Sequence, residues 1–137
     1  MSQKPEPIAI VGEGPEEKRL RASGRAHLPG RLFSAAGALA DADIVAVPSR
    51  WEGMPNVALE AMALGKPIVA SRVGGLPALL EGGAGILVPP ADPAALWEAI
   101  RGLLDDPERS RALGEAARRR VARYALPRMV EAHEALY

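Results

Sequence analysis

The chain has 137 residues, 48% of them hydrophobic, which is enough for one compact domain with a core and too short for two ordinary domains. Seventeen basic residues balance 17 acidic ones, so no net field favours nucleic acid or a strongly acidic partner. Cysteine is absent, and His27 and His133 are too few and too far apart for a zinc site. No metal or other cofactor is expected.

No apolar run approaches the roughly 20 residues that a bilayer span requires. The N-terminal stretch MSQKPEPIAIVGEG lacks the charged-then-apolar layout of a signal peptide. A cytoplasmic location is therefore the expectation.

Short runs rich in Ile and Val predict buried strands at residues 7–11, 43–48, 66–71 and 85–90. Helices are predicted between them, from Pro15 to Gly24 and from Pro55 to Gly65, because proline near the start and glycine past the end is typical of helices. Strands that alternate with helices imply parallel crossovers with helices on both faces of the sheet. The predicted class is α/β, as a three-layer Rossmann-like domain.

The pattern is helical only after Val88. Asp92 is predicted to cap a helix that runs through Gly102, and Asp106-Pro107 to start a second helix that reaches about Tyr124. A last, separate segment is predicted from Pro127 to the end of the chain.

The segment from Pro48 to Gly75, PSRWEGMPNVALEAMALGKPIVASRVGG, places a loop and a helix directly after a predicted strand. Ligands of open parallel sheets bind beyond the carboxyl ends of strands. Glu52, in the loop, and Glu60, in the helix, are separated by seven residues, and a carboxylate can bind two vicinal sugar hydroxyls. Free N–H groups at the helix start, around residues 56–58, suit a diphosphate. The alternative is that both glutamates are solvated surface residues.

This segment resembles the E-x7-E region of glycosyltransferase family four, whose approximate pattern is P-S-x-x-E-G-x-x-x-x-x-L-E-A-M-A-x-G-x-P-V-V-A-S-x-x-G-G. The residues in register are Pro48, Ser49, Glu52, Gly53, Leu59, Glu60, Ala61, Met62, Ala63, Gly65, Pro67, Val69, Ala70, Ser71, Gly74 and Gly75. The stretches IVGEGPEEKRL, HLPGRL and GILVPPADPAALWEAIRGLLDDPERSRALGEAARRRV also resemble the family, so nearly the entire chain is covered.

The resemblance implies the C-terminal, nucleotide-sugar-binding half of a GT-B enzyme that uses a UDP- or GDP-sugar without metal. It implies that Glu52 faces the donor sugar as the catalytic residue and that Glu60 holds the ribose. The implied donor site also includes Gly12, Gly14, Arg31, Leu32, Ser49, Gly53, Met54, Asn56 and Val57. Gly12 and Gly14 are expected in a tight turn that borders the cleft, because Glu17 stands where a dinucleotide fingerprint requires glycine.

Two other patterns have competing interpretations. Asp41 and Asp43 imitate a D-x-D metal motif, but they precede a strand, so a helix end at Asp41 is the preferred interpretation. The arginines between Arg109 and Arg123 indicate either a solvated helix face paired with Asp105, Asp106, Glu108 and Glu115, or attraction to an anionic membrane at which the protein would be peripheral. The solvated face is the preferred interpretation.

The sequence departs from the family at its start, where nothing matches the usual first strand, its V-G-R-L-x-x-x-K-G loop and the helix that follows. The strands at 7–11 and 43–47 are therefore expected either to pair directly or to recruit a second copy of the chain through their open edges. Residues 1–122 are expected to form the nucleotide-binding domain, and residues 123–137 a helical segment that crosses back to an N-terminal acceptor domain.

The function expected from these features is transfer of a hexose from a nucleotide diphosphate sugar with retention, with this chain as the donor-binding part. The alternatives are a non-catalytic module that binds nucleotide or nucleotide sugar, and a fragment that is inactive on its own.

Overall fold

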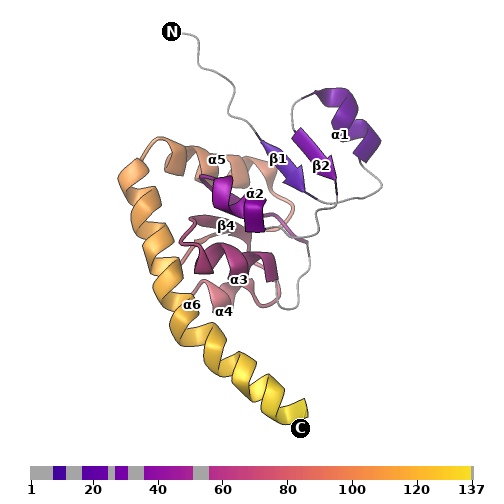
Figure 1. The fold of residues 1–137 in the computed structure, drawn as a ribbon. Coiled ribbons are helices and arrows are strands. Elements are labelled where there is room, and N and C mark those ends of the chain that lie inside the picture. The colour runs from indigo at the N-terminus through magenta and orange to yellow at the C-terminus, as the bar shows by residue number, and fades with distance from the viewer. Residues whose placement is uncertain (1–7, 12–16, 25–26, 31–35, 51–55, 137) are drawn as a thin grey trace. The chain divides into compact units, whose positions relative to one another are not determined.

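A computed structural model describes residues 8–11, 17–24, 27–30, 36–50 and 56–136 of the chain (Figure 1). The chain divides into two compact units, Met1–Ala35 and Ala36–Tyr137, and each is considered by itself.

The first unit is a strand–helix–strand arrangement. Strand β1 (Ala9–Val11) and strand β2 (His27–Gly30) are parallel, with Ala9 opposite His27, and helix α1 (Glu17–Ser23) connects them. Helix α1 ends at Gly24, whose φ of +64° is accessible to glycine at little cost. The predicted strand and helix in this region are thus confirmed.

The second unit contains a three-stranded parallel sheet in the order β3 (Val45–Val47), β4 (Ile68–Ser71) and β5 (Ile86–Val88). The central strand β4 is buried along its whole length and pairs with both neighbours. Such a continuous apolar run is typical of a parallel strand that is covered on both faces. These three strands lie within the predicted ranges, and the α/β Rossmann-like class is confirmed.

Helices cover both faces of this sheet. Helix α5 (Pro93–Leu104) packs on β4 and β5, and its Leu103 forms a core cluster with Val69 and Val88. Helix α3 (Asn56–Ala63) contacts β3 and β4 from the other side, as Figure 1 shows. The result is the expected three-layer arrangement within residues 36–137.

Helix α3 ends in a hydrogen-bonded turn that requires a left-handed residue. The N–H of Lys66 donates to the carbonyl of Ala61 and that of Gly65 to the carbonyl of Met62, each at 3.0 Å. Gly65 has a φ of +70°. This pair of bonds is the Schellman arrangement, with glycine at the position where a Cβ is costly. The predicted end of the helix is confirmed.

Two further helices are short. Helix α2 (Ala36–Asp41) ends at Asp41 as expected, and Lys66 Nζ donates a 2.8 Å hydrogen bond to the carbonyl oxygen of Ala40 in its last turn. Helix α4 (Leu76–Leu79) was not predicted from the sequence, and it buries Leu76 and Leu79 completely.

The helices after β5 begin at the predicted caps. Asp92 accepts a hydrogen bond from the Ala95 N–H at 3.0 Å, and Asp106 accepts one from the Arg109 N–H at 3.1 Å. Such caps satisfy N–H groups that have no partner inside the helix.

The predicted break before Pro127 is wrong, because helix α6 (Pro107–Leu136) is continuous. An internal proline removes one hydrogen bond and tends to bend a helix. The residues around it include Ala, Leu, Arg, Met and Glu, which have high helix propensity and favour continuation on both sides. The helix spans the predicted boundary at residue 122, and that boundary stays a prediction.

The predicted pairing of the strands at 7–11 and 43–47 concerns the two separate units and also stays a prediction. Among the helices of the described residues, none is both long enough and apolar enough to cross a membrane.

Candidate functional site

The carboxyl ends of β3, β4 and β5 lie at one edge of the parallel sheet. The register aligns Val47 with Ala70 and Ser71 with Val88, so the segments that follow the three strands begin side by side. In open parallel sheets this edge is where ligands bind. The loop predicted to hold the donor starts here, after β3.

The segment after β4 is a tight turn held by backbone hydrogen bonds. The N–H of Arg72 donates to the carbonyl of Val88 at 2.8 Å, and that of Val73 to the carbonyl of Ser71 at 2.9 Å. Gly74 has a φ of +53°, a conformation that residues with a Cβ rarely adopt. These bonds place the turn Arg72–Gly75 at the same edge as the start of α3.

Helix α3 has one buried face and one open face. Ala58, Ala61 and Met62 are fully buried against the rest of the unit. Asn56, Val57 and Glu60 are exposed, and their spacing of three and four residues places them together on the opposite face. The exposed side chains lie in the first two turns, and the N–H groups of the first turn have no helical acceptors.

This face combines a carboxylate, an amide and an apolar side chain beside free backbone donors. A carboxylate accepts hydrogen bonds from hydroxyl groups, and helix-start N–H groups accommodate anions. Val57 is 43% exposed, which is a high exposure for a valine, and its side chain offers apolar contact beside Asn56 and Glu60. The arrangement therefore suits a ligand that carries both hydroxyl groups and negative charge.

Several predicted site residues lie outside the described residues: Gly12, Gly14, Arg31, Leu32, Glu52, Gly53 and Met54. Ser49, half-buried, lies two residues after the end of β3. The structure thus brings together Asn56, Val57 and Glu60 on one helix face, and the roles of all the predicted site residues stay predictions.

Comparison with known proteins agrees with this architecture. The family described as "Glycosyl transferases group 1" matches residues 2–106, which is most of the chain. This chain belongs to the group 1 glycosyltransferases. It corresponds to the C-terminal region of their GT-B fold.

Individual relatives show the same relationship. A D-inositol 3-phosphate glycosyltransferase from Corynebacterium diphtheriae is 43% identical over 97 residues, which are 70% of this chain and 23% of that protein. Sucrose-phosphate synthase from Thermosynechococcus elongatus superposes with a TM-score of 0.75 at 34% identity, over 93% of this chain and 38% of that one. Anabaena HepE, solved in complex with UDP-glucose, gives a TM-score of 0.74 at 26% identity, over 83% and 35%. The chain spans about a quarter of the length of the curated relative.

In the parts of the chain that the structure describes, no three His, Asp or Glu side chains gather closely enough to hold a metal ion. Metal independence stays a prediction, because the loop after β3 is only partly described.

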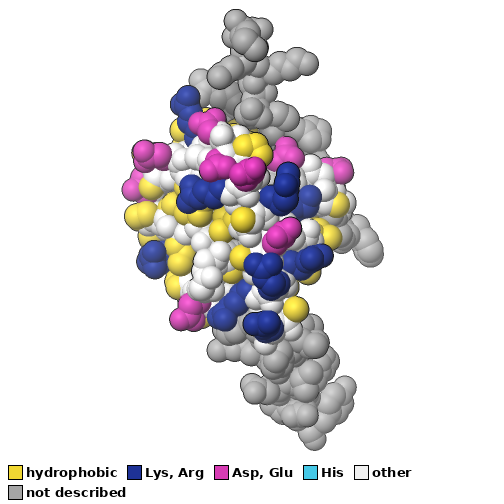
Figure 2. Space-filling model, turned by 90° about the vertical axis from the view of Figure 1, so that its left-hand side faces the viewer, with side chains coloured by type: hydrophobic (Ala, Val, Ile, Leu, Met, Phe, Trp, Pro, Cys, Tyr) yellow, Lys and Arg dark blue, Asp and Glu magenta, His cyan; other side chains and the backbone are white. Residues whose placement is uncertain are grey.

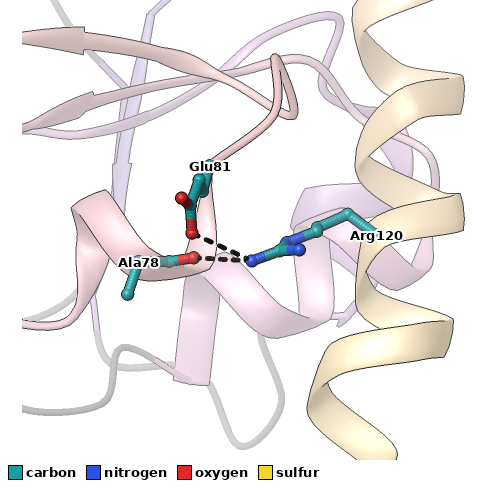
Figure 3. A network of polar contacts seen from close by, with 3 residues as sticks. All are labelled: Ala78, Glu81 and Arg120. Atoms are coloured by element: carbon teal, nitrogen blue, oxygen red, sulfur yellow. Dashed lines mark hydrogen bonds and ion pairs between the residues drawn. The ribbon is translucent and has the colours of Figure 1, made fainter.

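One polar network was not anticipated. Arg120 was expected to pair along the helical face with residues such as Glu115, yet its Nη2 lies 3.0 Å from the carbonyl oxygen of Ala78 and 3.6 Å from a Glu81 carboxylate oxygen (Figure 3). Residues 42 positions apart meet here, and local periodicity carries no information about such a contact.

The remaining arginines of α6 behave differently. Arg111, Arg118, Arg119 and Arg123 are exposed, with Glu108 and Glu115 exposed on the same helix. Figure 2 shows basic and acidic side chains interspersed on one face of the molecule. The mixture favours the solvated interpretation, and association with a membrane stays a prediction.

Proposed function

We propose that this chain binds the nucleotide diphosphate sugar donor of a glycosyltransferase that transfers a hexose with retention. The observation that carries this proposal is the exposed face of α3, where Asn56, Val57 and Glu60 lie together at the carboxyl edge of the sheet. HepE, which shares the fold and 26% identity, has been solved with UDP-glucose, and this supports a UDP-sugar as the donor.

The roles of the residues follow from their chemistry. The carboxylate of Glu60 would accept hydrogen bonds from both ribose hydroxyls, since one carboxylate can bind two O–H donors. The N–H groups of Asn56 and Val57 would bind the diphosphate, which carries the negative charge that a helix start favours.

Glu52 would orient the donor sugar from the loop before α3. Preorganised donors that face a leaving diphosphate stabilise its developing charge, and this requires no metal in principle. The reaction as proposed therefore uses protein groups alone.

The first test is a calorimetric titration of the chain with UDP, GDP and their glucose and mannose conjugates. We expect UDP or GDP to bind and Glu60→Ala to weaken binding about 10- to 100-fold, because hydrogen bonds to charged groups contribute about 1.5–3 kcal/mol. Glu98→Ala, which removes another exposed glutamate on α5, is the matched control and should bind as the wild type does. Equal affinity in the two variants would refute the assignment of Glu60.

A second candidate is a module that binds the nucleotide without catalysis. Mixing the chain with a separately expressed N-terminal GT-B domain and a UDP-sugar separates the two. Sugar transfer that appears only in the mixture supports the enzyme, with product stereochemistry by NMR as the test of retention. Nucleotide binding without transfer supports the module.

A further inference from the structure

Arg120 extends from α6 to the short helix that follows the β4 turn (Figure 3). Its side chain is 30% exposed, whereas the side chain of Glu81 is 75% exposed. The ion pair with Glu81 is therefore close to solvent, which screens it. The 3.0 Å hydrogen bond to the Ala78 carbonyl is the more specific of the two contacts.

Ala78 lies in the last turn of α4, where carbonyl groups lack N–H donors within the helix. Arginine side chains commonly satisfy such carbonyls. Because α4 has only four residues, it cannot satisfy them by continuing, and Arg120 supplies the donor from a different element.

Helix α4 is in turn bonded to the turn at the site. The N–H of Leu79 donates to the carbonyl of Gly75 at 3.0 Å, and that of Leu76 to the carbonyl of Val73 at 3.1 Å. Any displacement of α4 therefore displaces the turn Arg72–Gly75, which lies at the carboxyl edge of the sheet.

The same helix α6 also fixes α3. A Cβ on Gly114 of α6 would overlap the carbonyl oxygen of Gly65, so the two backbones touch where α3 ends. Helices α3 and α6 also pack directly against each other. One helix thus sets the positions of both segments that flank the candidate donor site.

We propose that Arg120 is a positioning residue for donor binding. By holding α4, it fixes the position of the turn Arg72–Gly75 relative to the first turn of α3. The nucleotide requires this relative position in order to bind. This inference rests on the proposed function. It assigns to Arg120 no contact with the donor itself.

The test compares Arg120→Met with Arg119→Met. Methionine keeps the apolar stem of the side chain and removes the donors, and Arg119 is the exposed neighbour on the same helix. We expect Arg120→Met to weaken UDP binding about three- to tenfold, the range of couplings carried by residues outside a site. Arg119→Met should bind as the wild type does. Arg120→Lys, which keeps a cationic donor, should restore most of the affinity.

A second readout requires no nucleotide. The backbone amide chemical shifts of Gly74 and Gly75 in the free protein should change in Arg120→Met and remain unchanged in Arg119→Met. If Arg120→Met does not fold, Arg120→Lys provides the same comparison, with smaller changes of the same two signals expected.

Wild-type affinity for UDP in Arg120→Met, with the fold intact, overturns the proposal. If only GDP binds to the wild type, the same comparison is made with GDP. Absence of binding of both UDP and GDP by the wild type overturns the proposed function instead. In that case unchanged Gly74 and Gly75 signals in Arg120→Met overturn the positioning role, and shifted signals support it.

Discussion

Gly114 in α6 lies against the backbone of Gly65, with no room between them for a side chain. A Cβ at Gly114 would overlap the Gly65 carbonyl oxygen and lie 3.0 Å from its carbonyl carbon and 3.4 Å from the nitrogen of Pro67. These are backbone atoms and cannot rotate away. The contact joins the end of the helix that carries Glu60 to the helix that carries Arg120.

Gly114→Ala should therefore destabilise the protein by about 1–3 kcal/mol, the usual cost of overpacking. Gly102→Ala is the matched control, because Gly102 is also helical and its Cβ would meet nothing closer than a flexible Arg109 atom at 3.8 Å. That variant should gain about 0.5–1 kcal/mol, since alanine is the better helix former. Urea unfolding measures both. A Gly114→Ala variant as stable as the wild type would contradict the close contact.

Substitution of Gly65 tests the cost of backbone strain, rather than overpacking, at the same contact. A Cβ here would lie 3.8 Å from the Gly114 carbonyl oxygen, which is ordinary contact, so only the backbone conformation is strained. With φ at +70°, Gly65→Ala should lose about 1–2 kcal/mol in thermal or urea unfolding. Gly65→Asn should lose less, because asparagine adopts this conformation more readily. Equal losses in the two variants would argue against backbone strain.

Asp92→Ala removes the side chain that caps α5. The lost hydrogen bond to the Ala95 N–H should cost about 0.5–2 kcal/mol of unfolding free energy. Asp105→Ala, at the C-cap of the same helix, removes a carboxylate from the end at which α5 presents carbonyl groups, and should change stability by less than about 0.5 kcal/mol. A loss for Asp92→Ala no larger than that for Asp105→Ala would contradict the role of the cap.

Val57→Glu places a negative charge on the face proposed for the diphosphate. We expect it to weaken UDP binding about tenfold or more through charge repulsion and to leave stability nearly unchanged, since acidic residues are favourable in the first turn of a helix. Leu64→Glu changes a residue of similar exposure, 44% against 43%, seven positions along the chain. Seven helical residues span about 10 Å, beyond the screening length of about 8 Å at physiological salt. Titration calorimetry should thus show nearly normal affinity for Leu64→Glu, and equal weakening in both variants would contradict the proposed site.

The sequence predicted those parts of the fold that local patterns encode. The apolar run around Val69 predicts a strand, Gly65 predicts the end of α3, and Asp92 predicts a cap; all three are confirmed. The predicted break at Pro127 is wrong, because the helix propensity of a long run of surrounding residues outweighs the cost of one proline. Helix α4 was missed because its four residues are too few to show a period.

The candidate site was predicted to a smaller extent. The family resemblance groups Asn56, Val57 and Glu60 in one site, and all three are exposed on one face of α3, while their roles stay predictions. The bond from Arg120 to Ala78 was not predictable, since it joins elements that meet only after the sheet and helices have packed.

The central position of β4 in the sheet determines how its amide protons exchange with solvent. With a hydrogen-bonded neighbour on each side and no exposed residue, its amide protons can exchange with deuterium only when the whole unit unfolds. The turn at Gly74 is attached directly to this strand. A ligand at that edge would therefore bind next to the strand whose amide protons exchange most slowly in this unit. The surrounding loops could rearrange while β4 keeps its hydrogen bonds to β3 and β5.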